Sequence, residues 1–280
     1  MATELRQRFE DYMTLRNLAP KTHEAYINSV VQLAKYYNRS PDKLSNDEIQ
    51  KYLLHLIRER KLAWSSVNVQ FSAFRCFYKK LLKWDETKFH IPPRPRSKQL
   101  PVVMPLEDVL KIIDSTSNLK HRTILMTTYT AGLRVSEVVK LEPKHIESQR
   151  MLIRVDQGKG RKDRYTILSQ KALDTLKSYW YAYRPGKWLF FGNDKAKAIS
   201  DATAQKIYYR AKEASAVNKG LGIHTLRHCF ATHHLEQGTD IYTIKEMMGH
   251  KSLETTLKYL HVAGNRIAEV KSPMDKIISN

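Results

Sequence analysis

The feature that most limits how this chain can fold is a proline-rich stretch at residues 91–101. It reads Ile-Pro-Pro-Arg-Pro-Arg-Ser-Lys-Gln-Leu-Pro. Its prolines exclude a helix and its charged side chains exclude burial, so we expect an exposed, semi-rigid linker. The chain has 280 residues, which suits one large domain or two modest ones, and the linker favours two. Its basic residues could lie along an anionic backbone, or the stretch could be only a soluble connector.

The residues before the linker have apolar side chains at helical spacing. Pro20 can begin a helix without the loss of a hydrogen bond, and Ser45 with Glu48 forms a capping-box pattern. We expect four helices, which begin near Leu5, Lys21, Ser45 and Ser65. The fourth is expected to bury Val69, Phe74, Phe77 and Leu81. The aromatic residues of this segment are most simply explained as core.

The residues after the linker are also mostly helical but contain one β-hairpin. Strand character is found in residues 151–155 and 165–168, on either side of a glycine-containing turn at residues 156–163. Helical patterns are expected at residues 106–114, 123–131, 170–183, 201–214, 225–237, 242–248 and 253–260. The predicted fold is therefore mainly α, with one small antiparallel hairpin that has a basic tip.

The chain is strongly basic, with 48 Lys and Arg against 28 Asp and Glu and a formal net charge of +20. Such an excess favours phosphate backbones, which bind through counterion release, although a basic enzyme without a polyanionic partner remains an alternative. No segment approaches the roughly 20 apolar residues of a membrane span, and no signal peptide opens the chain, so no membrane partner is expected. The two cysteines, Cys76 and Cys229, suggest no disulfide framework and therefore a reducing cytosol.

Residues 132–137, Gly-Leu-Arg-Val-Ser-Glu, place an arginine at the start of an otherwise apolar helix. An unpaired buried charge is very costly, so Arg134 needs an anionic partner. Glu137 alone could be that partner. Alternatively, Arg134 is a fixed fork for phosphate oxygens and Glu137 supports it.

His224, Arg227 and His228 lie at i, i+3 and i+4, so they share one end or face of a helix. Two histidines four apart could bind zinc, but a zincin helix has a glutamate directly after the first histidine, and here that residue is Thr225. We therefore expect no metal site. His228 could also be a hydrogen-bonded structural residue.

Three further residues carry weak signals when they are taken singly. Lys159 lies between two glycines at the predicted hairpin tip, either as an exposed turn residue or as a proton donor to a leaving oxygen. His250 follows Gly249, which is expected to end a helix, and Tyr259 lies nine positions later. A phenol has a pKa of about 10, so it attacks phosphorus only when it is deprotonated or held beside cations. No phosphate-loop pattern accompanies Lys159, so no nucleotide site is expected.

In this order and context, these segments resemble the tyrosine recombinases, the phage-integrase and Xer-type superfamily. The matching segments are residues 130–137, 158–160, 224–233, 248–250 and 255–261. The resemblance covers nearly the whole chain and implies the DNA breaking-rejoining fold. It implies a four-helix, SAM-like core-binding domain that binds DNA at residues 1–90, the basic linker at 91–101, and a mostly helical catalytic domain with a C-terminal tail at 102–280.

The resemblance also implies roles for single residues. The six catalytic positions are Arg134, Lys159, His224, Arg227, His250 and Tyr259, and none departs from the family pattern. Tyr259 would be the nucleophile, Lys159 would protonate the departing 5′ oxygen, and His224 would be the general acid/base that accepts the tyrosine proton. The remaining three would clamp the scissile phosphate, with Glu137 and His228 in support. Neither metal nor ATP would be needed, since one phosphodiester is exchanged for another ester.

The implied partner is double-stranded DNA with specific recombination sites. A homotetramer would act on two such sites through 3′-phosphotyrosine intermediates and a four-way Holliday junction, with an accessory or partner recombinase as a possibility. Free protein would be a monomer or weak oligomer in the bacterial cytoplasm, and on DNA it would be associated with the nucleoid. Candidate contacts to the DNA backbone are Lys21, Arg75, Lys79, Lys80, Arg161, Lys162 and Arg164.

Two alternative functions stay open. A type IB topoisomerase-like enzyme would use the same chemistry to relax DNA without exchanging partners, and a regulator that kept the fold would bind DNA without cutting it. Among recombinase roles, dimer resolution, phage integration, transposition and cassette capture all fit. The absence of a long insertion between Lys159 and His224 argues mildly against cassette capture.

Overall fold

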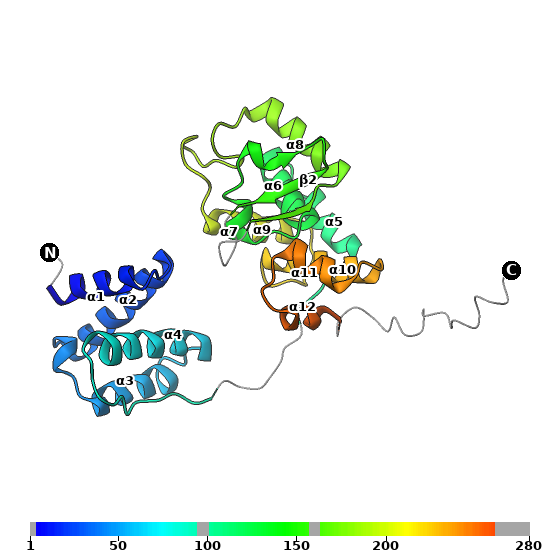
Figure 1. Ribbon diagram of the computed structural model, residues 1–280. Helices are drawn as coiled ribbons and strands as arrows, with labels where there is room; N and C mark the ends of the chain where they lie inside the picture. The colour runs from blue at the N-terminus through cyan, green and yellow to red at the C-terminus, as the bar shows by residue number, and fades with distance from the viewer. Residues whose placement is uncertain (1–3, 94–100, 157–162, 261–280) are drawn as a thin grey trace, which may run out of the picture. The chain divides into compact units, whose positions relative to one another are not determined.

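The computed structural model describes residues 4–93, 101–156 and 163–260, and the chain divides into two compact units after Lys98 (Figure 1). This division falls within the proline-rich stretch that was predicted to be a linker. The predicted mainly α chain with one small antiparallel sheet is confirmed. Within the described ranges, no helix is long and apolar enough to cross a membrane.

The described part of the first unit contains helices and no strand. Its elements are α1 (Glu4–Leu15), α2 (Pro20–Tyr37), η1 (Pro41–Lys43), α3 (Asn46–Arg58), α4 (Trp64–Phe74) and η2 (Arg75–Leu81), a π-helical continuation of α4. The predicted capping box begins α3, where the backbone N–H of Glu48 donates to Ser45 Oγ and that of Ser45 donates to Glu48 Oε2. The core includes Leu33, Leu53 and Phe77.

One predicted core position in α4 is wrong. Val69 is 42% exposed, because the buried side of α4 is formed by Val67, Gln70 and Phe74. These three residues recur at helical spacing, and Val69 lies on the opposite side of the helix.

The described part of the second unit contains two largely buried helices among its other elements. Its elements are α5 (Leu106–Asp114), α6 (Leu119–Thr130), α7 (Val135–Val138), η3 (Pro143–His145), β1 (Ile146–Glu147), β2 (Leu152–Val155), β3 (Arg164–Ile167), α8 (Gln170–Tyr183), α9 (Asp201–Ala214), α10 (His224–Glu236), α11 (Ile241–Met248) and α12 (Leu253–Leu260). Residues 123–128 of α6 are all buried. In α10, seven of the eight residues at 225–232 are buried. Helices buried on every side show little amphipathic pattern in their sequence.

The sheet has three antiparallel strands in the order β1-β2-β3, one more than the predicted hairpin. Ile153 of β2 pairs with Ile146 on one side and with Thr166 on the other. The extra strand has only two residues, which is too short for an alternating pattern to predict. Helix α11 packs against β3 and, together with α10 and α12, forms one cluster of helices (Figure 1).

Candidate active site

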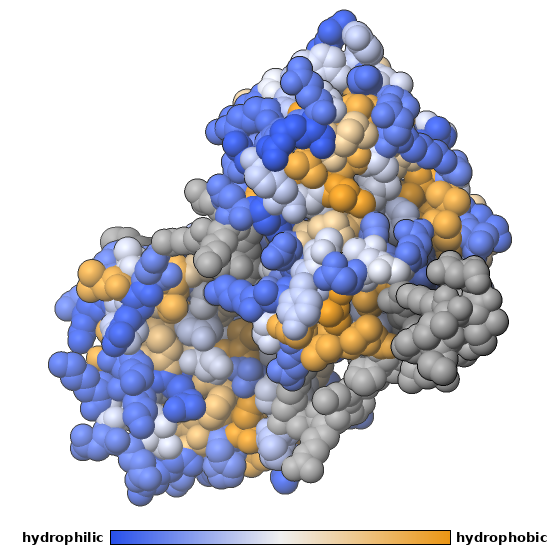
Figure 2. Space-filling view, turned by 45° about the vertical axis from the view of Figure 1, so that its right-hand side comes forward, coloured by the Kyte–Doolittle hydropathy of each residue, from blue (hydrophilic) through white to orange (hydrophobic). Residues whose placement is uncertain are grey.

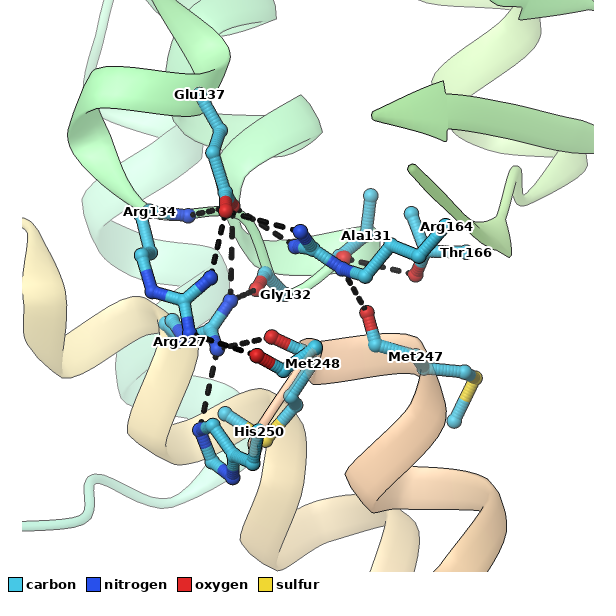
Figure 3. A network of polar contacts seen from close by, with 11 residues as sticks. Ala131, Gly132, Arg134, Glu137, Arg164, Thr166, Arg227, Met247, Met248 and His250 are labelled. Carbon is cyan, nitrogen blue, oxygen red and sulfur yellow. Dashed lines mark hydrogen bonds and ion pairs between the residues drawn. The ribbon is translucent and has the colours of Figure 1, made fainter. Parts of the chain in front are cut away.

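A single buried carboxylate gathers arginines from three separate segments (Figure 3). Glu137 Oε1 accepts a hydrogen bond from Nη1 of Arg134 at 2.6 Å, and Arg164 donates from Nη1 and Nη2 at 2.9 and 2.8 Å. Arg227 Nη1 lies 3.7 Å from the other carboxylate oxygen. The Glu137 side chain is 6% exposed, so it holds these three guanidinium groups in place within a largely dry environment.

The local sequence explains how α7 places Arg134 and Glu137 side by side. Arg134 is the N-cap of α7, and its backbone N–H donates to Glu137 Oε2 at 2.8 Å. Gly132 allows the sharp turn from α6 because its φ is +60°, a conformation that favours glycine. A Cβ at that position would lie 2.4 Å from Cδ1 of Phe230, so α10 also packs closely against the turn.

The electrostatic state of this cluster follows from its composition. Burial alone would raise the pKa of the Glu137 carboxyl, but the hydrogen bonds and charges of Arg164 and Arg134 lower the pKa to about 2. Burial, followed by the charge of Arg134, lowers the pKa of Arg227 to about 9, and at neutral pH this side chain still carries its proton. Three guanidinium groups therefore face one carboxylate, and the excess positive charge favours an anion such as phosphate.

Arg227 connects the α6–α7 turn with the end of α11. Its side chain is 4% exposed, and it donates from Nη1 to the carbonyl of Gly132 and from Nη2 to the carbonyl of Met248. Nη2 also lies 3.1 Å from Nε2 of His250. These contacts leave the guanidinium little freedom to move, which preorganises it for an anionic ligand.

His250 is neutral and fixed in one tautomer by its neighbours. Because Arg227 donates to Nε2, the ring proton is on Nδ1, which lies 2.9 Å from Oγ1 of Thr256. Burial, and then the charges of Arg227 and Arg134, lowers the pKa of His250 to about 3. Gly249 directly before it has a φ of +61° and caps α11 in the left-handed conformation, as predicted.

Tyr259 comes to this cluster from α12. It is 4% exposed, and its ring lies nearly parallel to the ring of His250, with an interplanar angle of 11° and a centroid distance of 6.3 Å. Its hydroxyl is 2.9 Å from Nδ1 of His228. Burial raises the pKa of Tyr259, although the charges of Arg227 and Arg134 act in the opposite direction. The phenol is therefore protonated at neutral pH.

His224 and His228 both lie on α10, with ring centroids 6.1 Å apart. Burial, and then the nearby charges of His224 and Arg227, lowers the pKa of His228 to about 4. This ring is neutral at neutral pH, and in its Nε2–H tautomer Nδ1 accepts a hydrogen bond from the Tyr259 hydroxyl. His224 is the first residue of α10 and is exposed, and partial desolvation with the charges of Arg227 and Arg134 lowers its pKa as well.

Five of the six predicted catalytic side chains are thus part of one connected cluster or next to it. They are Arg134, His224, Arg227, His250 and Tyr259. Lys159 lies outside the described residues, as do Arg161 and Lys162. His228, which was predicted to be a supporting residue, contacts the tyrosine hydroxyl directly.

Arg164 was named as a candidate contact to a DNA backbone, but its side chain is bound inside the protein. Its side chain is 9% exposed, Nε donates to the carbonyl of Met247 at 2.7 Å, and both Nη atoms bind Glu137. Strand alternation could have indicated this, because Arg164 shares one face of β3 with the buried Thr166. The other described candidates for backbone contact, Lys21, Arg75, Lys79 and Lys80, are all exposed.

Hydrophilic residues cover much of the face shown in Figure 2, and apolar residues form separate patches among them. Within the described parts of the chain, no group of three or more His, Cys, Asp or Glu side chains is placed to hold a metal ion. Among the described residues, the charged groups that meet in this site are Arg134, Arg164, Arg227 and Glu137.

Comparison with known proteins gives matches over both units. Residues 103–266 match the phage integrase family, and residues 5–86 match the N-terminal SAM-like domain of phage integrases. A putative integrase/recombinase, y4qK, from Sinorhizobium fredii is 39% identical over 98% of this chain and 89% of the relative. The tyrosine recombinase XerC of Pelobacter propionicus is 32% identical over 92% of this chain and 90% of the relative.

Solved structures with a similar fold include two Xer recombinases. The XerH site-specific recombinase bound to a palindromic difH substrate has a TM-score of 0.71 and 20% identity, with 95% of this chain and 83% of that chain covered. The XerA recombinase has a TM-score of 0.56 and 26% identity, with 95% of this chain and 97% of that chain covered.

Proposed function

This chain belongs to the phage integrase family and is a site-specific recombinase, and we propose that it cuts and rejoins DNA through a 3′-phosphotyrosine on Tyr259. The observation that carries this proposal is the convergence of Arg134, Arg227 and His250 beside the Tyr259 ring. Together these groups provide an anion site and a nucleophile in one place, which is what attack on a phosphodiester needs.

The arginines supply the electrostatic part of catalysis. Attack on phosphorus spreads negative charge over the nonbridging oxygens, and preorganised donors stabilise that charge without reorganisation during the reaction. Glu137 holds Arg134 and Arg164 by direct hydrogen bonds and Arg227 by a longer ion pair. Loss of one phosphate contact is expected to cost about 2.7–4 kcal/mol of transition-state stabilisation, by analogy with oxyanion holes.

The bond changes need no external energy source. Tyr259 Oη bonds to phosphorus as its proton passes to a neighbouring histidine, the bond from phosphorus to the 5′ oxygen breaks, and Lys159 gives that oxygen its proton. The 5′ hydroxyl of another strand then attacks the phosphotyrosine and releases the phenol. One phosphoester replaces another in each step, so the chain's own cationic residues suffice without ATP or a metal ion.

The proposed partner is double-stranded DNA, bound by four protomers at two recombination sites. The XerH structure contains difH DNA, and a lambda integrase structure of similar fold contains a dimer on a core site. The net charge of +20 supports a polyanionic partner. The exposed Lys21, Arg75, Lys79 and Lys80 are the proposed backbone contacts of the first unit.

The test is covalent capture on DNA. Sequencing the DNA that the Tyr259→Phe protein retains would first identify the target site. Nicked DNA with that site should form a protease-sensitive adduct with the wild-type protein, whereas Tyr259→Phe should bind the same DNA and form none, because it lacks the attacking oxygen. An adduct with Tyr259→Phe would show that another residue is the nucleophile.

A second assay separates recombination from the topoisomerase-like alternative. A recombinase should join DNA ends from two different sites, since a second 5′ hydroxyl replaces the first. Relaxation of a supercoiled plasmid by monomeric protein, without any recombinant product, would favour the alternative.

A further inference from the structure

The hydroxyl of Tyr259 is held by a residue to which the family resemblance gave no direct part. Oη of Tyr259 lies 2.9 Å from Nδ1 of His228, and the two ring centroids are 5.7 Å apart. His228 follows Arg227 on α10, so one turn of this helix supplies both a phosphate-binding guanidinium and the partner of the nucleophile. The hydrogen bond joins α10 to α12 inside the protein, where Tyr259 is 4% exposed.

His250 also lies beside the Tyr259 ring, but both of its ring nitrogens already have hydrogen-bond partners. Nε2 of His250 accepts from Arg227, and Nδ1, which carries the ring proton, faces Oγ1 of Thr256. This ring therefore has no lone pair left for the proton of the tyrosine. His224 is exposed at the first position of α10, where it is open to a bound phosphate group.

We propose that His228 is the general base for the nucleophile, and that its Nδ1 accepts the Tyr259 proton as Oη bonds to phosphorus. This inference rests on the proposed recombinase function. In cleavage, the bond from Oη to phosphorus forms, the bond from phosphorus to the 5′ oxygen breaks, and the phenol proton passes to Nδ1. Lys159 supplies the proton for the 5′ oxygen. In rejoining, His228 returns its proton to the departing phenolate, by microscopic reversibility.

The protonation states of the two partners suit this transfer. Burial raises the pKa of Tyr259, so the phenol keeps its proton until attack begins. Burial and the charges of His224 and Arg227 lower the pKa of His228 to about 4, so the ring is neutral at neutral pH and its Nε2–H tautomer presents the lone pair of Nδ1 to the phenol. A phosphate bound beside Arg227 would add negative charge near this ring and raise the pKa of His228, which makes it a better acceptor.

The test measures single-turnover adduct formation on nicked DNA that carries the site retained by Tyr259→Phe. His228→Asn keeps an oxygen near the position of Nδ1 that can accept the hydrogen bond, but it cannot accept a proton. If His228 is the base, this variant should slow adduct formation by about 10²–10⁴-fold, and the acid limb of the wild-type pH–rate profile should disappear. His228→Ala should be impaired to a similar extent.

A second substrate distinguishes protonation of the leaving group from deprotonation of Tyr259. When sulfur replaces the bridging 5′ oxygen, the leaving thiolate needs no proton. This substrate should restore adduct formation by Lys159→Ala but not by His228→Asn, because the tyrosine must still lose its proton. Restoration of His228→Asn by the sulfur substrate would overturn the proposal.

Matched variants on α10 provide controls and decisive alternatives. His234→Asn also replaces a part-buried histidine whose Nδ1 faces a hydroxyl, here that of Thr239, and it should leave the rate unchanged.

A near-normal rate for His228→Asn with a slow His228→Ala would show that His228 only positions Tyr259. A large loss in His224→Asn with none in His228→Asn would assign the base to His224. If the wild-type protein forms no Tyr259 adduct at all, the recombinase proposal itself fails.

Discussion

At the scale of single residues, the distinctive property of this site is the number of cations that one buried carboxylate orders. Glu137 binds Arg134 and Arg164 directly, and Arg227 lies 3.7 Å away. A buried ion pair adds little net stability over apolar packing, but removal of one partner leaves a buried charge uncompensated. The cluster is therefore stable only as a whole, and Arg164 belongs to it because its guanidinium binds Glu137 and the carbonyl of Met247.

Replacement of Arg164 tests this dependence. Arg164→Gln should lower the free energy of unfolding by about 3–5 kcal/mol, because Glu137 loses its bidentate partner while it remains buried. Arg150→Gln is the matched control, since Arg150 pairs with Glu147 at the surface with 61% of its side chain exposed, and such pairs contribute about 0–1 kcal/mol. Urea denaturation of both variants gives the comparison. Equal, small losses would contradict a structural role for Arg164.

The buried histidines predict how stability depends on pH. An unfolded histidine titrates near 6.5, whereas burial lowers the pKa of His228 to about 4 and that of His250 to about 3. Between these values the unfolded chain binds more protons than the folded protein, so stability is complete above pH 6.5 and falls as the pH falls. The stabilisation that comes from Glu137 is complete above its unfolded pKa of 4.5. It is lost only as the pH falls from 4.5 toward the folded pKa of about 2.

Thermal unfolding at pH 7 and pH 5.5 measures this effect. The wild-type protein should lose about 1 kcal/mol per buried histidine at pH 5.5. The double variant His228→Asn with His250→Asn should have a smaller loss, because two of the groups that resist protonation are gone. A pH dependence as steep in the double variant as in the wild type would place the titrating groups elsewhere.

At the scale of elements, the site is made where helices end or begin. Arg134 is the N-cap of α7, His224 begins α10, and Gly249 ends α11 with His250 directly after it. Helix and strand types were predicted from periodicity and capping residues, and the bounds of α5, α8, α9 and α12 agree with the prediction. The start of α6 was predicted four residues late because its first turn, residues 119–122, is mostly polar and only half-buried, and the N-cap at Asn118 was not recognised.

Gly249 provides a test of this geometry. Its φ is +61°, and an added Cβ would lie 2.7 Å from Cδ of Arg164. Gly249→Ala should therefore destabilise the protein by about 1–3 kcal/mol through backbone strain, and it should also slow adduct formation by displacing Arg164 and His250. Gly186→Ala is the control, because no atom lies within 4 Å of its added Cβ. If both variants unfold at the same denaturant concentration, the close approach at Gly249 is not important.

At the scale of the whole molecule, the chain consists of two compact units, and each matches its own part of the family pattern. The first unit contributes exposed lysines and arginines, and the second contains the cationic site. A protein that binds DNA with both units should make several phosphate contacts and release a counterion at each one.

Salt dependence measures the number of these contacts. If about six phosphates are bound, the affinity of Tyr259→Phe for its DNA site should fall about 10³-fold between about 50 and 200 mM salt. Lys79→Gln should reduce the slope of log affinity against log salt by about 1 if Lys79 binds a phosphate. Fluorescence anisotropy titrations at several salt concentrations give both slopes. An affinity that is independent of salt would contradict a phosphate-based interface.

Local sequence alone was enough to predict the mainly α fold with its small antiparallel sheet, and it singled out Arg134, Arg227 and His250 as candidate site residues. These features depend on periodicity, capping and short motifs, which act over a few neighbouring residues. Only the tertiary structure decided which side chains meet. Arg164 and Glu137 are 27 residues apart, and His228 and Tyr259 are 31 apart, so their hydrogen bonds depend on how strands and helices pack. Spacing along a chain does not contain that information, because side chains distant in sequence come together only when the apolar core places their elements.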